Sequence, residues 1–257
     1  MIGAIIGDIV GSIYEFDNIK TKDFKLFQDE MFFTDDSVMT IAIAKALSEK
    51  GDVGRNAIRW MRELGRKYPH SGYGGRFNMW LKDESMGPYD SYGNGSAMRV
   101  SAVGWFAESV EEVKELSRKV TEVTHNHPEG IKGAEATAIC VYHLLNGMEK
   151  DELRKIVERD YYSLDFTLDG IRDEYEFNES CQGTVPQAIE AFLESTDFED
   201  AIRNAISLGG DSDTLAAITG AMAEAYYGVP DNMRRKAEEI LTPELKRMLH
   251  EVEIHFA

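Results

Sequence analysis

The sequence has few cysteines and no long uninterrupted hydrophobic run. Its 257 residues include only two cysteines, Cys140 and Cys181, which cannot form a framework of several disulfides. This scarcity is typical of proteins from a reducing compartment, so we predict a cytoplasmic protein. No basic segment precedes the first apolar residues, and Asp8 follows them too early for a signal peptide.

Positive charge is scarce as well. The chain carries 46 acidic and 28 basic residues, which gives a formal net charge of -18. Because such a protein repels phosphate backbones and anionic lipids, we expect neither nucleic acid nor a membrane as a partner. No apolar run approaches the roughly 18 residues that span a bilayer. A phosphate-bearing ligand fits this charge only where cations or backbone N–H groups offset it.

Alternation of polar and apolar residues, the pattern of a strand, is almost absent, whereas helical spacing recurs along the chain. Hydrophobic residues make up 43% of the sequence, enough for a substantial core. No linker, repeat or low-complexity segment divides it. We therefore predict an all-α fold, with residues 1–257 forming one compact domain of ten or more helices.

Apolar spacing and the positions of glycine and proline give the expected helices. They cover residues 2–15, 35–50, 53–67, 76–82, 100–107, 110–124, 129–147, 150–160, 187–193, 198–208, 215–227, 231–241 and 243–254. Pro186 is expected in the first turn of its helix. The long irregular connection 68–95 suggests a functional loop, and 16–33 and 161–180 are also expected to be irregular.

Glycine recurs at every fourth position of residues 3–11, which predicts a flat helix surface against which another helix packs closely. Asp8, Ser12 and Glu15 would share another face of the same helix. A polar stripe on an otherwise apolar helix is either solvated or functional. This segment alone leaves the two possibilities equally open.

Asp211, Asp213 and Thr214 place three oxygen donors within four residues, at the start of an apolar helix. One Asp would be an ordinary N-cap, but two Asp and a Thr exceed what a cap requires. The helix dipole favours negative charge there by only about 1 kcal/mol. Crowded carboxylates at a buried helix start are costly unless a cation neutralises them. Capping with a solvated Asp and metal binding are equally compatible with this segment.

Thr34, Asp35 and Asp36 repeat the pattern before a second apolar helix. Two such clusters, far apart in the chain, suggest two sides of one site. All the candidate ligands are oxygens, without Cys or His at metal-binding spacing. This composition favours Mg²⁺, Mn²⁺ or Ca²⁺ over Zn²⁺.

Two further segments carry candidate ligand contacts. The segment Gly93–Ser96, Gly-Asn-Gly-Ser, precedes an apolar helix and could hold a phosphate with its backbone N–H groups. A plain glycine turn is the commoner use of so short a motif. His125 and His127 lie two residues apart, a spacing that suits loop hydrogen bonds or ligand contact better than a metal site.

Taken together and in this order, these motifs resemble the ADP-ribosylglycohydrolase family, which includes the dinitrogenase reductase-activating glycohydrolases. The resemblance covers residues 2 to about 228, and the segments Gly7–Glu15, Thr34–Ser37, Gly93–Arg99, Thr124–Pro128 and Gly209–Thr214 carry it. It implies an all-α fold, a centre of two Mg²⁺ or Mn²⁺ ions and hydrolysis of the bond between C1″ of the distal ribose of ADP-ribose and an acceptor. The substrate would be ADP-ribosyl-arginine or a related conjugate, on a protein or a small molecule. We predict a monomer or weak oligomer.

The resemblance also assigns roles to individual residues. The implied metal ligands are Thr34, Asp35, Asp36, Asp211, Asp213 and Thr214. The implied contacts to the diphosphate or distal ribose are Gly93, Asn94, Gly95 and Ser96, with His125 and His127 near the ligand. Glu15 would lie at the edge of the site as a metal ligand or an acid/base group. Because it stands apart in sequence from both Asp clusters, it is the expected proton-transfer group, with Asp36 as the alternative base.

Other functions remain compatible with the sequence. A dinuclear metal hydrolase of phosphoesters or diphosphates would use similar carboxylates, but would release AMP or phosphate. A non-catalytic ADP-ribose binding module is disfavoured because all the implied ligands and Glu15 are present. A purely structural protein would leave both Asp clusters unexplained. The sequence does not identify the acceptor, which the loops 16–33, 68–92 and 161–180 should determine.

Overall fold

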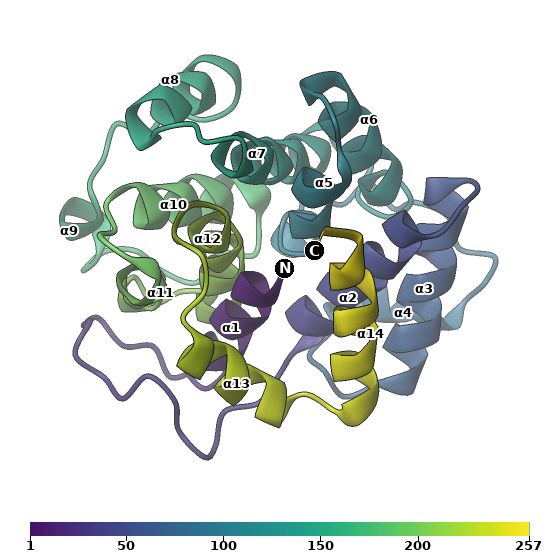
Figure 1. Ribbon diagram of the computed structural model, residues 1–257, viewed down its shortest axis with the longest axis horizontal. Coiled ribbons are helices and arrows are strands. Elements are labelled where there is room, and N and C mark those ends of the chain that lie inside the picture. The colour runs from purple at the N-terminus through teal and green to yellow at the C-terminus, as the bar shows by residue number, and fades with distance from the viewer. Residues whose placement is uncertain (257) are drawn as a thin grey trace.

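Helices account for nearly all the regular structure. The computed structural model describes residues 1–256, which contain fourteen α-helices and, apart from one isolated bridge between Gly93 and Ser180, no strand pairing (Figure 1). The helices are α1 (Ile2–Gly11), α2 (Asp35–Ser48), α3 (Val53–Lys67), α4 (Gly75–Lys82), α5 (Ser101–Phe106), α6 (Val110–Thr121), α7 (Pro128–Leu145), α8 (Lys150–Asp160), α9 (Leu168–Ile171), α10 (Cys181–Leu193), α11 (Phe198–Ser207), α12 (Ser212–Tyr227), α13 (Asp231–Ile240) and α14 (Pro243–Glu253), with 3-10 turns η1 (Asn94–Ser96) and η2 (Ile254–Phe256). The predicted all-α fold of ten or more helices is confirmed.

Helices α1 and α12 lie side by side at the centre of the molecule, with α2 on the other side of α1 (Figure 1). Glycine makes this close approach possible. A Cβ atom on Gly7 would come within 1.9 Å of the backbone oxygen of Ala216, and one on Gly11 within 2.4 Å of the Cα atom of Asp213. The end of α1 therefore abuts the start of α12, as the glycine spacing predicted for a partner helix.

Helix α1 is shorter than predicted, because it ends at Gly11 and not at residue 15. The Ser12 hydroxyl donates to the backbone oxygen of Ile9 at 2.8 Å, and the Tyr14 N–H closes a tighter turn onto Gly11. Asp8 and Glu15 consequently do not share one helical face. Asp8 is buried within the helix, whereas Glu15 follows it in the turn that reaches α12.

Helix α10 begins earlier than predicted, at Cys181 instead of residue 187. Ser180 caps it by accepting a hydrogen bond from the Gly183 N–H at 3.2 Å. Pro186 therefore lies inside the helix and not in its first turn. Proline at this position removes one backbone donor from the helix, and the buried neighbours of Pro186 keep the helix intact.

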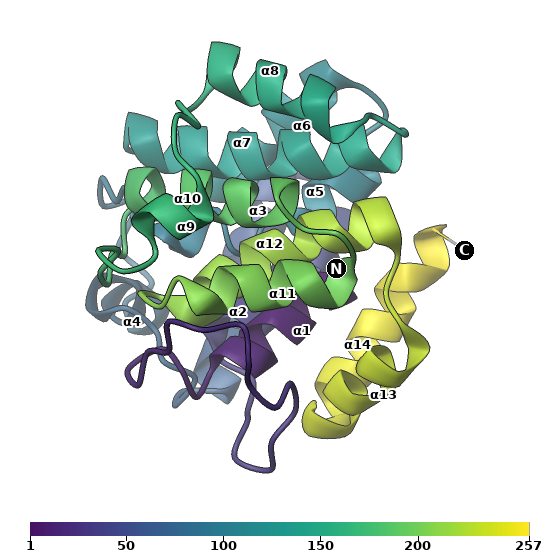
Figure 2. The same cartoon turned by 90° about the vertical axis from the view of Figure 1, so that its left-hand side faces the viewer.

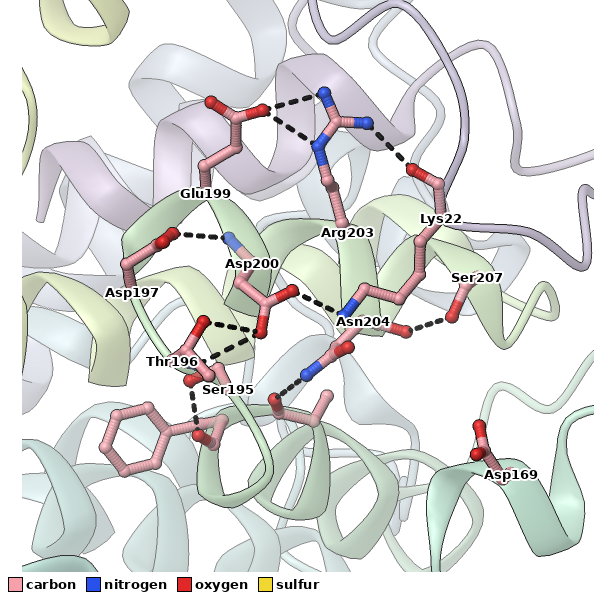
Figure 3. A network of polar contacts seen from close by, with 12 residues as sticks. Lys22, Asp169, Ser195, Thr196, Asp197, Glu199, Asp200, Arg203, Asn204 and Ser207 are labelled. Atoms are coloured by element: carbon pink, nitrogen blue, oxygen red, sulfur yellow. Dashed lines mark hydrogen bonds and ion pairs between the residues drawn. The ribbon is translucent and has the colours of Figure 1, made fainter.

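The segment 16–33 is irregular, as predicted, and forms a long surface loop below α11 (Figure 2). Figure 3 shows how side chains of α11 hold it. Arg203 donates to the backbone oxygens of Lys22 and Phe24 at 2.8 Å each, and the Lys22 ammonium pairs with Asp200. The loop is thereby fixed to the helix that leads into the second acidic cluster.

The segment 161–180 is mostly irregular, as expected, and includes the single turn of α9. None of the helices within residues 1–256 has both the length and the apolar character that a bilayer crossing requires.

Candidate metal centre and ligand cavity

The two acidic helix starts face each other across one cavity. The Thr214 hydroxyl at the start of α12 donates to Asp36 Oδ2 at the start of α2, at 3.2 Å. Glu15, Asp211 and Asp213 place carboxylate oxygens within 4.8 Å of one another. Segments from three parts of the chain thus converge on a small volume.

The start of α2 is held by Asp8, a fully buried carboxylate on α1. Asp8 accepts hydrogen bonds from the N–H and hydroxyl of Thr34, at 2.9 and 2.7 Å, and from the N–H and hydroxyl of Ser37. Burial raises the pKa of Asp8 to about 6, although these hydrogen bonds oppose the shift. Because the Thr34 hydroxyl bonds to Asp8 behind the cluster, the side chains that reach the cavity from this turn are Asp35 and Asp36.

The start of α12 is held differently, by the side-chain amide of Asn18, which bonds to a glycine turn in the left-handed conformation. Gly209 and Gly210 have φ angles of +67° and +70°, which L-residues with a Cβ rarely adopt. Asn18 accepts from the Gly210 N–H at 2.7 Å and donates to the Gly210 oxygen at 2.9 Å. Its amide also donates to the backbone oxygen of Tyr14 at 2.6 Å. Asn18 therefore fixes the turn that carries Glu15 against the turn that carries Asp211.

Burial and mutual repulsion dominate the electrostatics of the clustered carboxylates. Burial, followed by repulsion from neighbouring carboxylates, raises the pKa of Asp35, Asp36 and Asp213 well above the ordinary value. Burial also raises the pKa of Glu15 to about 7, with Asp211 as the foremost neighbouring charge. One oxygen of Asp36, Oδ1, is buried without a hydrogen-bond partner. A set of hard oxygen donors with an unpartnered buried carboxylate oxygen fits a divalent cation such as Mg²⁺ or Mn²⁺.

The cavity has a volume of about 560 Å³ and two chemically different halves. We call the first the acidic half; it consists of Glu15, Asp35, Asp36, Asp211, Asp213 and Thr214. We call the second the donor half; it includes Gly93, Asn94, Gly95, Arg76, Arg99 and His125, and the remaining lining also contains Asp90 and Glu179. The structure therefore brings most of the predicted site residues into one cavity.

Asn94 joins the two halves. Its side-chain amide donates to Asp211 Oδ2 at 2.7 Å and to Thr184 Oγ1 at 3.1 Å. Asn94 is a predicted ligand contact, but its side-chain amide nitrogen donates to a carboxylate of the acidic half. Movement of the glycine turn would be transmitted directly to Asp211.

The backbone of the glycine turn is less open than its sequence suggested. The N–H groups of Gly93, Asn94 and Ser96 donate to Ser91 Oγ, the Glu179 oxygen and the Gly93 oxygen, respectively. Three of the four N–H groups expected to be available for a phosphate are therefore used within the protein.

Ser96 and His127, two of the predicted ligand contacts, do not line the cavity and instead bond to backbone groups next to it. The Ser96 hydroxyl donates to the backbone oxygens of Gly93 and Gly130, at 3.1 and 2.8 Å. His127 caps α7 by accepting the Glu129 N–H at Nδ1, at 3.1 Å. His125, by contrast, is buried and lines the cavity.

Sequence reasoning missed Asn18 and Arg99 as parts of the site. Asn18 lies in an irregular segment, and no local pattern links it to Gly210. Arg99 offered a signal, because it is a lone basic residue within an otherwise apolar segment that follows the glycine turn. Its side chain is 1% exposed, the surroundings in which an arginine is rarely found without a specific partner.

Known proteins are similar to this chain over most of its length. The sequence model of the ADP-ribosylglycohydrolase family matches residues 1–256. ADP-ribosylhydrolase ARH3 of Mus musculus is 28% identical, over 98% of this chain and 91% of that protein. ADP-ribosylarginine hydrolase Tri1 of Pseudomonas putida (strain GB-1) is 28% identical, over 89% of this chain and 70% of that protein.

A solved structure shares the fold. It is described as an ADP-ribosylglycohydrolase-related protein complex, and it aligns with a TM-score of 0.68 and 23% identity, over 98% of this chain and 94% of that chain. At this identity the likeness concerns the fold alone. Since the family model spans almost the whole sequence, the chain belongs to the ADP-ribosylglycohydrolase family of hydrolases.

Proposed function

We propose that this hydrolase binds two divalent ions, Mg²⁺ or Mn²⁺, in its acidic half and hydrolyses the ribosyl bond between ADP-ribose and an acceptor. One observation carries the proposal: two Asp-rich helix starts and Glu15 converge on one cavity that Arg76 and His125 also line. ADP-ribosyl-arginine is the acceptor conjugate we favour, because one relative is named as an ADP-ribosylarginine hydrolase.

The residues that would hold the ions come from two helix starts. Asp35 and Asp36 would bind from α2, and Asp211, Asp213 and Thr214 from α12. Thr34 remains a predicted ligand, although its hydroxyl donates to Asp8 and its side chain does not line the cavity. Bound ions of this kind supply Lewis-acid chemistry, since they orient hydroxyls of the sugar and lower the pKa of water. Their charge would also offset the repulsion among the carboxylates and toward a dianionic ligand.

Glu15 is the proposed proton-transfer group. Hydrolysis adds water to C1″, breaks the bond from C1″ to the acceptor, and returns a proton to the departing acceptor. Positive charge develops at C1″ in the transition state, where the surrounding carboxylates stabilise it. Glu15 is a carboxylate that lines the cavity beside Asp211 and Asp213, and in this proposal it accepts the proton from the water and returns a proton to the departing acceptor. Asp36 is the alternative base.

A product assay tests the proposal. The full chain is incubated with ADP-ribosyl-arginine or O-acetyl-ADP-ribose, in Mg²⁺ or Mn²⁺ and then in chelator, and the products are identified by mass. The expected result is metal-dependent release of ADP-ribose. Release of AMP would instead indicate diphosphate hydrolysis, and metal-dependent binding of ADP-ribose without any product would indicate a binding module.

The proposal includes the setting in which the enzyme works. A cytoplasmic location is supported by the state of Cys140 and Cys181, which are both buried free thiols. A monomer or weak oligomer is the expected state in solution, and light scattering coupled to size-exclusion chromatography would measure it.

A further inference from the structure

Arg99 is a buried cation whose partners are all uncharged. Its guanidinium lies over the ring of Phe77, 5.8 Å from Cζ to the ring centroid. Nη2 donates to Thr124 Oγ1 at 2.7 Å and to the backbone oxygen of Val120 at 3.3 Å, and Nε has no partner. Burying an arginine without a carboxylate as hydrogen-bond partner is costly, so these contacts call for a physical explanation.

The contact with Thr124 determines where the proton of its hydroxyl points. A guanidinium can only donate hydrogen bonds, so Thr124 Oγ1 must accept from Arg99. The hydroxyl proton is then free for another acceptor. His125 Nδ1 lies 2.8 Å away, whereas the Thr121 backbone oxygen lies 3.5 Å away, too far for a good hydrogen bond. The hydroxyl therefore donates to Nδ1.

This hydrogen bond selects one tautomer of His125. A neutral imidazole carries one proton, and because Nδ1 is the acceptor, the proton resides on Nε2. Burial, followed by the charge of Arg99, lowers the pKa of His125 well below its ordinary value, so that the ring stays neutral.

The protonated nitrogen faces the glycine turn. A Cβ atom on Gly95 would lie 3.5 Å from His125 Nε2, and one on Gly93 would lie 3.6 Å from it. The Nε2–H bond thus points to the place where an anion would meet the turn. Since three N–H groups of this turn are already used, a side-chain donor here would supply what the backbone lacks.

We propose that Arg99 and Thr124 are positioning residues that hold His125 as its Nε2–H tautomer, so that the ring donates a hydrogen bond to a phosphate oxygen of ADP-ribose beside Gly93 and Gly95. The identity of this acceptor rests on the proposed function. The tautomer rests on the geometry of Arg99, Thr124 and His125 alone.

Nitrogen-15 NMR of the full chain, labelled at histidine and kept in Mg²⁺, tests the tautomer. A His125→Gln variant identifies the signals of His125. We expect the Nε2–H form in the wild type. Thr124→Val removes the hydroxyl at nearly constant volume, so the ring should shift to the Nδ1–H form or a mixture. ADP-ribose should then bind about tenfold more weakly, as expected for a misdirected hydrogen bond to a charged group.

Two matched variants distinguish loss of the relay, by which we mean the hydrogen bonds from Arg99 to Thr124 and from Thr124 to His125, from general damage to the fold. Thr124→Ser keeps the hydroxyl and should restore the Nε2–H form. Thr121→Val makes the same change at a buried hydroxyl that has no hydrogen-bond partner, and should leave both the tautomer and the affinity for ADP-ribose as in the wild type.

Several outcomes would overturn the inference. An Nδ1–H tautomer in the wild type, or an unchanged tautomer in Thr124→Val, would refute the relay. A changed tautomer with unchanged ADP-ribose affinity would refute the phosphate contact. Failure of the proposed function is a separate result. The NMR and binding measurements require no turnover, so they test the tautomer and the phosphate contact even if the wild type releases no ADP-ribose from any conjugate.

Discussion

The acidic half and the donor half of the cavity differ in charge and in the way they are built. In the acidic half, segments far apart in sequence meet: Asp8 holds the Thr34–Ser37 turn, and Asn18 holds Gly210. In the donor half, contacts between neighbours, such as Thr124 with His125, occur beside contacts between distant segments, such as Arg99 with Thr124. The acidic half carries unbalanced negative charge, whereas the donor half carries buried positive charge without a carboxylate partner. The fold thus prepares one side for cations and the other for an anion.

The largest expected effect comes from removing a carboxylate of the acidic half. We predict that Asp36→Ala or Asp211→Ala lowers the rate of ADP-ribose release by more than about 100-fold, because each change removes a proposed metal ligand. Initial rates at saturating Mn²⁺ would measure this. Asp29→Ala, a change at an exposed carboxylate on the 16–33 loop, is the matched control and should keep the wild-type rate. Full activity in either cluster variant would refute a site shared by the two clusters.

Glu15→Gln should have the next largest effect. The change keeps the shape of the side chain but removes its ability to transfer a proton, so we expect turnover to fall about 100-fold. Binding of ADP-ribose in the donor half should persist, which calorimetry in the presence of metal would show. If turnover stays within a factor of about two of the wild type, Asp36 becomes the better candidate for the base.

Asn18→Ala should have a smaller effect, which is confined to the acidic half. Loss of the clamp on Gly210 should weaken Mn²⁺ binding about tenfold, since residues that orient metal ligands typically contribute that much. The NMR signals of His125 should stay unchanged, because the donor half is held by other contacts. A displaced His125 signal would show that the two halves are coupled more tightly than their contacts indicate.

The smallest effect concerns stability against pH in the absence of metal. The folded-state pKa values of Asp8 and Glu15, about 6 and about 7, are raised above their ordinary values. The folded protein therefore holds more protons than the unfolded chain, and its stability should fall as the pH rises from about 4 to about 7. Thermal unfolding in chelator should show this as a loss of a few degrees. Mg²⁺ should reduce the slope, and a stability that rises with pH in chelator would contradict the electrostatic account.

The fold and the two acidic helix starts could be predicted because their signals are local. Helical spacing, the glycine at every fourth position of residues 3–11 and the excess of carboxylates over capping needs all lie within short windows of sequence. The same reasoning extended α1 to residue 15, because apolar spacing continues through Ile13 although the backbone tightens after Gly11. It also delayed the start of α10, since the cap provided by Ser180 is weaker as a signal than Pro186.

The parts that escaped prediction depend on tertiary contacts. Asp8 was a candidate, but its partners lie in a turn before another helix, and Asn18 contacts a glycine close to the other end of the chain. No window of sequence contains both partners. The motif around Ser96 was found, but the direction of its side chain, toward Gly130 and not the cavity, depends on α7.

Anomalous scattering from crystals soaked in Mn²⁺ tests the central claim most directly, that the two acidic helix starts form one metal centre. The account predicts two peaks in the acidic half, between the carboxylates of Asp35 and Asp36 on one side and those of Asp211 and Asp213 on the other. Absence of any peak there at millimolar Mn²⁺, or peaks only elsewhere on the protein, would contradict it.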